Sequence, residues 1–258
     1  MSLRPLPALR DNYIWLLADP ASGTALAVDP GEAAPVLHAL DAEGLALTTI
    51  LLTHHHADHV GGTPELAARF PGATVYGPHD DRIPGTLRRV GDGDEVGIPA
   101  PAIRFNVIEV HGHTRSHIAY HGEGLLFCGD TLFSLGCGRL FEGTPSEMLA
   151  SLDRLAGLPD DTKVCCGHEY TVANAAFALT VETDNRALQT RAAAAHALRE
   201  RGEPTLPARL ADERAANPFL RTDAIANERI PWPGAPKPDA SRVDRFAALR
   251  LAKDHFRA

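Results

Sequence analysis

The stretch ILLTHHHADHVGG, residues 50–62, places four histidines and one aspartate within six positions, directly after an apolar run. Neighbouring imidazoles compete for hydrogen-bond partners and repel one another once protonated, so such a cluster needs a compensating partner. A metal ion can be this compensating partner, because it binds the imidazole lone pairs that would otherwise compete for protons. The run is internal and contains an aspartate, unlike a terminal histidine tag. The stretch therefore predicts a metal site in a loop that follows a strand.

The spacing within this loop is H-x-H-x-D-H, formed by His54, His56, Asp58 and His59. Side chains two positions apart in an extended segment point to the same side, so His54 and His56 can bind one ion. Asp58 and His59 follow on a turning segment and can face a second ion. His55 points away from the first pair and is left outside the ligand set. Imidazole and carboxylate ligands suit Zn²⁺, and also Mn²⁺ or Fe.

Four ligands cannot fill the shells of two metals, so further ligands are expected in loops after later strands. The segment FCGDTLFS places Asp130 at a strand end, and VCCGHEYT places His168 after another strand. The segment VHGHTRSH offers His111, His113 and His117, and the residues alone do not choose among them. Each of these residues also has an ordinary alternative as a structural core or surface residue.

The first two thirds of the chain have the pattern of short strands with few helices. A helix is expected over residues 32–43, ended by Gly44, and another over 63–70, with Thr63 as N-cap and Pro64 in the first turn. The acidic run 92–95 is predicted to be a hairpin turn. Strands are expected over residues 12–19 and 24–30 (a hairpin), 47–53, 73–77, 102–110, 117–121, 124–130 and 162–167.

The chain beyond residue 171 is rich in Ala, Leu, Arg and Glu and poor in β-branched residues, which favours helices. Helical segments are expected up to Gly202, between Pro207 and Pro218, and over residues 241–258. The pattern therefore predicts an α/β domain followed by a smaller helical domain.

The chain has 258 residues and a formal net charge of −8. The charge argues against a general nucleic-acid-binding surface, although a local basic pocket for an anionic small molecule stays possible. No apolar run approaches the ~18 residues of a membrane helix, and the first residues lack the apolar core of a secretory signal. We expect a soluble cytoplasmic protein with free thiols at Cys128, Cys137, Cys165 and Cys166.

Several segments together resemble one family. The H-x-H-x-D-H loop is the hallmark of the metallo-β-lactamase superfamily. Within it, the chain is most similar to the glyoxalase II (hydroxyacylglutathione hydrolase) family, in segments that span both predicted domains. These segments are DNYIWLL, THHHADHVGG, YGP, GDTLFSLGCGRLFEGT, CGHEYT, NPFLR and KDHF.

The resemblance implies an αββα sandwich over residues 1–170, with the catalytic site, and a helical glutathione-binding domain over residues 171–258. It implies two divalent metal ions, with Zn favoured and Fe or Mn as alternatives. One ion would be bound by His54, His56 and His113, the other by Asp58, His59 and His168, with Asp130 as the bridge. His113 corresponds to the histidine of the family's P-G-H-T segment, where His111 replaces the proline. Asp58 and Asp130 would be the catalytic carboxylates.

The resemblance also assigns the glutathione contacts to Arg139, Tyr170, Arg250 and Lys253. Phe141 stands where some family members have a tyrosine. From the residues alone, Arg250 and Lys253 favour a solvated helix face. Residues 242–257 nevertheless carry five Lys or Arg against two acidic residues, and such an excess attracts carboxylates.

The implied reaction is hydrolysis of S-(2-hydroxyacyl)glutathione, typically S-D-lactoylglutathione, to glutathione and a 2-hydroxy acid, which detoxifies methylglyoxal. Two metal ions lower the pKa of a water between them, so that hydroxide can attack the thioester at neutral pH. The thiolate leaves without a strong acid, because its pKa is about 8.5. Cys137 is predicted to be structural rather than a nucleophile. We expect a monomer that binds this small molecule and neither nucleic acid nor a membrane.

Two other functions compete with this one. A glutathione persulfide dioxygenase uses a related loop with a single iron, but the second set of ligands, Asp58, His59 and His168, argues against it. A non-catalytic metal- or glutathione-binding module would bind glutathione without thioester turnover.

Overall fold

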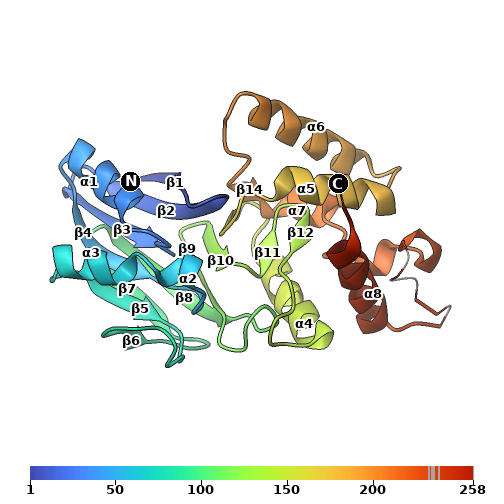
Figure 1. The fold of residues 1–258 in the computed structure, drawn as a ribbon, viewed down its shortest axis with the longest axis horizontal. Coiled ribbons are helices and arrows are strands. Elements are labelled where there is room, and N and C mark those ends of the chain that lie inside the picture. Colours follow the sequence, from blue (N-terminus) through green and yellow to red (C-terminus); the bar gives the residue numbers. More distant parts are fainter. Residues whose placement is uncertain (232, 234–235, 238, 258) are drawn as a thin grey trace. The chain divides into compact units, whose positions relative to one another are not determined.

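The computed structural model describes residues 1–231, 233, 236, 237 and 239–257. The chain forms two compact units. Unit 1 comprises Met1–Glu109 and Ser116–Gly129, and unit 2 comprises Val110–Arg115 and Asp130–Ala258. In Figure 1, unit 1 runs from blue to green and unit 2 mainly from yellow-green to red. These units do not test the domain boundary predicted at residue 170, which stays a prediction.

The first sheet of unit 1 has the strand order β1-β2-β3-β4-β5-β6. The pairs from β1 to β3 are antiparallel, and those from β3 to β6 are parallel. The helices α1 (Ala34–Glu43), α2 (Ala57–Val60) and α3 (Thr63–Arg69) form the crossovers between parallel strands. The strands are β1 (Ser2–Ala8), β2 (Asn12–Asp19), β3 (Thr24–Val28), β4 (Ala46–Leu51), β5 (Thr74–Gly77) and β6 (Arg88–Arg89).

Both faces of this sheet are covered within unit 1 (Figure 1). On one face, Leu40 of α1 and Leu66 of α3 belong to the same apolar cluster as Leu16 of β2. On the other, the rings of Trp15 and Phe127 lie 6.5 Å apart, and Phe127 belongs to a second sheet. The second sheet contributes antiparallel strands to unit 1: β7 (Glu95–Pro99), β8 (Ala102–Glu109), β9 (Ile118–Gly122) and β10 (Leu125–Gly129).

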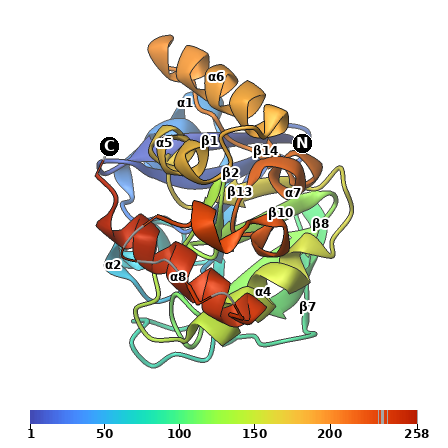
Figure 2. The same ribbon diagram turned by 90° about the vertical axis from the view of Figure 1, so that its right-hand side faces the viewer.

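Unit 2 is mainly helical. Figure 2 shows its helices, with α8 beside α4, and Arg242 of α8 donates to both carboxylate oxygens of Asp153 of α4 at 2.6 and 2.7 Å. Its helices are α4 (Pro145–Ala156), α5 (Thr171–Val181), α6 (Arg186–Glu200), α7 (Leu210–Ala216) and α8 (Arg242–His255), with 3₁₀ turns η1 (Thr222–Ala224) and η2 (Asn227–Arg229). Its strand pairs are the hairpin β11 (Leu132–Phe133) with β12 (Gly136–Cys137), and β13 (Lys163–Cys166) with β14 (Ala208–Arg209).

The structure confirms the α/β class, the predicted strands and the C-terminal helices. Two details were wrong. Gly62, not Thr63, is the N-cap of α3, and the turn at 92–95 is not a hairpin, because β6 and β7 belong to different sheets. The strand β1 and helix α4 were not predicted. The four cysteines form no disulfide, as expected, and all four are buried. Among the described residues, no helix is long and apolar enough to cross a membrane.

Candidate functional site

The histidine loop of unit 1 follows β4, at the carboxyl end of the parallel part of the first sheet. Polar side chains collect at such strand ends because parallel strands all end at the same edge. His56 has extended backbone angles and is the N-cap of α2, whereas the chain bends at His54. Their ring nitrogens, His54 Nε2 and His56 Nδ1, lie 3.0 Å apart. The two side chains lie together, and their role as ligands of one ion stays a prediction.

Asp29 supports this loop from the neighbouring strand end, and the sequence analysis missed it. Its carboxylate accepts hydrogen bonds from the Thr53 amide at 2.8 Å and the Thr53 hydroxyl at 2.7 Å, and lies 3.1 Å from Nδ1 of His59. Thr53 Oγ1 in turn lies 3.1 Å from His54 Nδ1. Because the Thr53 proton goes to Asp29, its oxygen accepts from His54. Both imidazoles therefore carry the proton on Nδ1 and present Nε2.

Asp58 lies on the first turn of α2, beside the buried His59. One Asp58 carboxylate oxygen, Oδ2, accepts from Asn12 Nδ2 at 3.1 Å and lies 3.5 Å from His59 Nε2. The close approach of the chain here requires Gly31, because a Cβ at that position would lie 2.0 Å from the Asp58 carbonyl oxygen. The DPG sequence after β3 thus serves this loop twice, through Asp29 and through Gly31.

Two other histidines of unit 1 have different partners. His55 lies with its Nδ1 3.4 Å from the buried carboxylate of Asp80, on which Ser116 and Arg82 also converge. The ring of His117 stacks on His54 with centroids 4.6 Å apart, and its Nδ1 lies 3.0 Å from the Ile118 carbonyl. Both placements agree with structural roles.

In unit 2, Asp130 lies between two of the predicted histidine ligands. Its Oδ2 is 3.4 Å from His113 Nε2 and 3.3 Å from His168 Nε2, and all three residues are buried. Of the three histidines left open by the sequence, His113 is the one beside Asp130. Its Nδ1 lies 2.9 Å from the Arg139 carbonyl, which again leaves Nε2 for a ligand role. A Cβ at Gly138 would lie 1.9 Å from the Asp130 carbonyl.

His168 follows β13, and its ring is flanked by Tyr170. The two rings are stacked, with centroids 4.7 Å apart and planes within 4°. The intervening Glu169 accepts from the amide and hydroxyl of Thr205 at 2.8 and 2.6 Å. The turn that carries His168 is therefore held on both sides.

The donor atoms within each unit have the spacing of atoms that share a metal ion. Two ligands about 2.0 Å from zinc at a tetrahedral angle lie about 3.3 Å apart. The observed separations run from 3.0 Å (His54 to His56) to 3.5 Å (Asp58 to His59), with the Asp130 pairs between them. Imidazole nitrogens fixed by hydrogen bonds, together with carboxylate oxygens, form a donor set for divalent metal ions.

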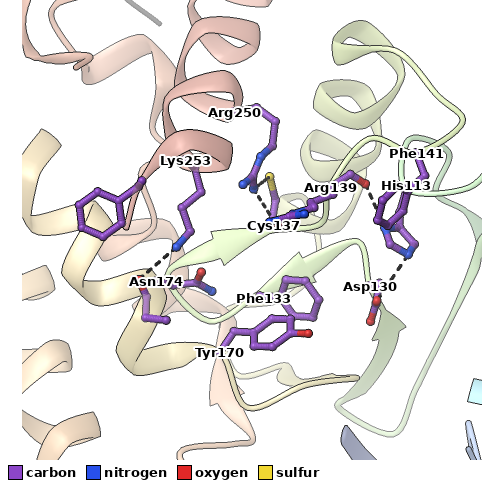
Figure 3. A pocket seen from close by; sticks show the side chains of 12 residues that line it. His113, Asp130, Phe133, Cys137, Arg139, Phe141, Tyr170, Asn174, Arg250 and Lys253 are labelled. Atoms are coloured by element: carbon purple, nitrogen blue, oxygen red, sulfur yellow. Dashed lines mark hydrogen bonds and ion pairs between the residues drawn. The ribbon is translucent and has the colours of Figure 1, made fainter. Parts of the chain in front are cut away.

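A cavity of about 420 Å³ opens beside Asp130 in unit 2 (Figure 3). The hairpin and the loop after it line it from one side, the start of α5 from another, and α8 contributes two cations. All four predicted glutathione contacts line it. The lining consists of His113, Asp130, Phe133, Cys137, Arg139, Phe141, Tyr170, Ala173, Asn174, Arg250, Lys253 and Phe256.

Arg250 does not lie on a solvated helix face, and the interpretation favoured by the residues alone was wrong for it. Its side chain is buried: Nη1 donates to the Cys137 carbonyl at 2.8 Å, Nη2 donates to Asp254 at 3.0 Å, and the guanidinium lies over the ring of Phe219. The sequence of α8 could not show this burial, because the groups that stabilise the buried guanidinium include the Cys137 carbonyl and the Phe219 ring, which lie outside the helix.

Lys253 lies one turn further along α8 and donates to the Ala173 carbonyl at 3.1 Å. Burial, together with the positive charges of Arg250 and Arg139, lowers the pKa of Lys253 to about 8. Three cations thus surround one cavity, with Asp254 as a nearby carboxylate. The cavity is electrostatically suited to a ligand with negative charge.

Two further residues at the cavity bear on earlier expectations. Burial raises the pKa of the Cys137 thiol to about 11, so it is a neutral thiol at pH 7, in line with a structural role. Phe141 is 62% exposed and contacts the ring of His113. Phe133, Asn174 and Phe256 also line the cavity and were missed, because isolated aromatic and amide residues carry no spacing signal.

Comparisons with known proteins agree with these features. The family model of the metallo-β-lactamase superfamily matches residues 9–168, and that of the hydroxyacylglutathione hydrolase C-terminus matches residues 169–256. A hydroxyacylglutathione hydrolase of Xanthomonas campestris pv. campestris is 55% identical over 258 residues, covering all of both chains. One of Xylella fastidiosa is 54% identical over 256 residues, covering 99% of this chain and 98% of the relative.

Among solved structures, that of ETHE1 from Myxococcus xanthus is similar in fold, with a TM-score of 0.66 and 26% identity. The match covers 99% of this chain and 91% of that one. The fold, the donor residues and the full-length matches lead to one family. The chain belongs to the hydroxyacylglutathione hydrolase (glyoxalase II) family of the metallo-β-lactamase superfamily.

Proposed function

We propose that this chain hydrolyses the thioester of S-(2-hydroxyacyl)glutathione, typically S-D-lactoylglutathione, to glutathione and a 2-hydroxy acid. This reaction would serve methylglyoxal detoxification. The observation that carries the proposal is the cavity of unit 2. Its lining combines Arg139, Arg250 and Lys253 with Asp130 and His113. Cations that suit a glutathione carboxylate therefore line the same cavity as two predicted metal ligands.

We further propose two divalent metal ions, Zn being favoured and Fe or Mn being alternatives. The assignment follows the family resemblance, and the donor spacings and Nδ1 partners within each unit support it. His54, His56 and His113 would hold one ion, Asp58, His59 and His168 the other, and Asp130 would bridge them. When bound, such a pair lowers the pKa of water and polarises a carbonyl oxygen.

The protein's own groups prepare this chemistry by fixing protons and orientations. Asp29 and the Arg139 carbonyl hold the Nδ1 protons of His59 and His113, so that Nε2 of each ring keeps its lone pair. Asn12 holds the Asp58 carboxylate through Oδ2. Rigid ligands of this kind need little rearrangement during the reaction, which is the main electrostatic advantage of a folded site.

Substrate binding is assigned to the cationic side of the cavity. Lys253 and Arg139 would pair with a carboxylate of the glutathionyl moiety, and Tyr170 would contact the peptide near the reacting end. Arg250 is already paired with Asp254 and the Cys137 carbonyl, so it would contribute positive charge and hold the cavity wall. The departing thiolate has a pKa of about 8.5 and requires no strong acid.

The remaining expectations are also proposals. Residues 1–170 would form the catalytic domain and residues 171–258 the glutathione-binding domain. The chain would act as a monomer in the cytoplasm, with a small molecule as its partner and without binding nucleic acid or membranes.

The test is hydrolysis of S-D-lactoylglutathione by the purified protein, followed by the loss of thioester absorbance, with metal analysis on the same sample. We expect turnover and about two equivalents of metal. Oxygen uptake on glutathione persulfide without thioester hydrolysis would instead support the dioxygenase. Glutathione binding without turnover would support a non-catalytic module.

A further inference from the structure

The β11–β12 hairpin closes with a two-residue turn that is unusual in its backbone. Leu135, the second residue of the turn, has a φ of +58°, a region that residues other than glycine, asparagine and aspartate seldom adopt. The side chain of Leu135 is fully buried in an apolar cluster with Ala175 of α5. A leucine stays in this conformation only when its surroundings hold it there, and such positions concentrate near functional sites.

Glu213 of α7 and Asn217, which follows α7, hold this turn. We call these two residues the hairpin clamp. The Glu213 carboxylate accepts from the Ser134 hydroxyl at 2.6 Å and from the Leu135 amide at 2.7 Å. Asn217 Nδ2 donates to the carbonyls of Phe133 and Gly136, both at 3.0 Å. The clamp thus binds all four residues from Phe133 to Gly136.

The acidic member of the clamp, Glu213, is shielded from solvent. Burial raises the pKa of Glu213. The hydrogen bonds from Ser134 and Leu135 and the positive charge of Arg191 lower it, but the effect of burial is larger. Arg191 Nη2 donates to the Ser134 hydroxyl oxygen at 3.1 Å and to the Thr205 carbonyl at 2.8 Å. A buried carboxylate with this many directed partners fixes geometry more strictly than an apolar contact does.

The hairpin held by the clamp forms part of the cavity wall. Phe133 and Cys137, one from each strand, line the cavity (Figure 3). The Cys137 carbonyl accepts from Arg250, and the Ser134 carbonyl accepts from Asn174 at 3.1 Å. A shift of the turn would therefore move two lining residues directly and two more through hydrogen bonds.

We propose that the hairpin clamp, Glu213 and Asn217, consists of positioning residues that set the affinity of the cavity for the glutathionyl moiety through the β11–β12 hairpin. The inference rests on the proposed function, because it takes glutathione as the ligand of the cavity. Neither clamp residue lines the cavity. The clamp acts on substrate binding and leaves the predicted metal ligands untouched.

The experiment uses the full-length, metal-loaded protein with the substitution Glu213→Gln. The amide keeps the shape of the side chain, but its single oxygen can accept only one of the two bonds from the turn, and its NH₂ group accepts none. We expect the KM for S-D-lactoylglutathione and the dissociation constant of free glutathione to rise about tenfold, the order expected for losing one buried hydrogen bond. We expect kcat and metal content to stay close to their original values.

Two comparisons separate positioning from general damage to the fold. Glu182→Gln removes another buried carboxylate of unit 2, which pairs with Arg221, and should leave the glutathione dissociation constant unchanged. A lactoyl thioester of a small thiol without the peptide should be hydrolysed equally well by Glu213→Gln and by the unsubstituted protein. Ser134→Ala is a milder change, because three of the clamp's four bonds to the turn remain, and it should raise the KM in the same direction by less.

Glutathione binding with an unchanged dissociation constant in both Glu213→Gln and Ser134→Ala would overturn the clamp and leave the proposed function standing. An equal loss of activity of Glu213→Gln on S-D-lactoylglutathione and on the small lactoyl thioester would also overturn it, since such a loss indicates general damage to the fold. An unsubstituted protein that binds glutathione but fails to hydrolyse its thioester would contradict the proposed function alone. The role of the clamp would still be tested by the glutathione dissociation constants of the variants.

Discussion

The histidine loop of unit 1 and the cavity of unit 2 are built in opposite ways. The loop takes four predicted ligands from six consecutive positions, and a second group of residues, Asp29 and Asn12, orients them. The cavity takes its lining from four separate stretches of the chain between residues 113 and 256. The difference teaches that a donor set for metals can be compact in sequence, whereas recognition of a long flexible substrate draws on distant segments.

The largest effect is expected from Asp130→Ala, because Asp130 of unit 2 is a predicted metal ligand and also lines the cavity. We expect bound metal to fall and kcat to drop by about a hundredfold or more. Metal analysis and thioester hydrolysis on the same sample measure both. Asp161→Ala, at an exposed carboxylate of unit 2, is the control. Two retained metal ions with full rate would show that Asp130 is not the bridge.

Asp29→Asn tests the loop without removing a proposed ligand. The amide cannot accept from Thr53 and His59 as the carboxylate does, so the histidine tautomers are no longer fixed. We expect the metal dissociation constant to rise about 10- to 100-fold, the usual effect of losing such a partner, as measured by competition with a chelator. Asp41→Asn, on the exposed side of α1, should have no effect. Unchanged metal affinity would reduce Asp29 to a purely structural residue.

Lys253→Ala tests the cavity without touching the loop. The lysine is proposed to bind the substrate equally in the ground state and the transition state, so we expect the KM to rise about tenfold with little change in kcat. Steady-state kinetics on S-D-lactoylglutathione separate the two constants. Lys237→Ala removes an exposed lysine and serves as the charge-matched control. A large fall in kcat at constant KM would contradict the binding role.

The smallest expected effect is a pH dependence of substrate binding. Lys253 has a pKa of about 8 in the free protein, so it is charged below that pH and neutral above it. The KM should therefore rise several-fold as the pH passes from about 7 to about 9. Lys253→Arg should remove most of this rise, because a guanidinium stays protonated throughout. The same rise in both proteins would assign it to another group.

Site residues that lie close together in the sequence were predictable, whereas those whose partners lie in distant segments were not. The histidine loop, Asp130 and His168 carried a local signal, since each follows an apolar strand and has glycine nearby. Asp29 carried none: it becomes relevant only because β3 and β4 are parallel and end side by side. The burial of Arg250 was likewise invisible, because its partners, the Cys137 carbonyl and Asp254, include a backbone atom 113 positions away.

The fold shows the same limit. Strands with strong apolar runs and the C-terminal helices were predicted, and Ser241 is the N-cap of α8, in a capping box with Asp244. The strand β1 was missed, because Pro5 and Pro7 disfavour a strand. It pairs with β2 as the outermost strand of its sheet, where a proline costs no ladder bond on the open side. Its position in the sheet, rather than its residues, makes it a strand.

Arg139 serves two purposes with two different parts of one residue. Its backbone carbonyl accepts from His113 Nδ1, whereas its side chain lies at the cavity, 3.6 Å from Asp254. Every amino acid supplies the same carbonyl, so mutation at this codon can change what the cavity selects while the histidine keeps its acceptor. Position 139 is therefore a place where natural variation or protein engineering can alter substrate choice without first having to rebuild the reactive centre.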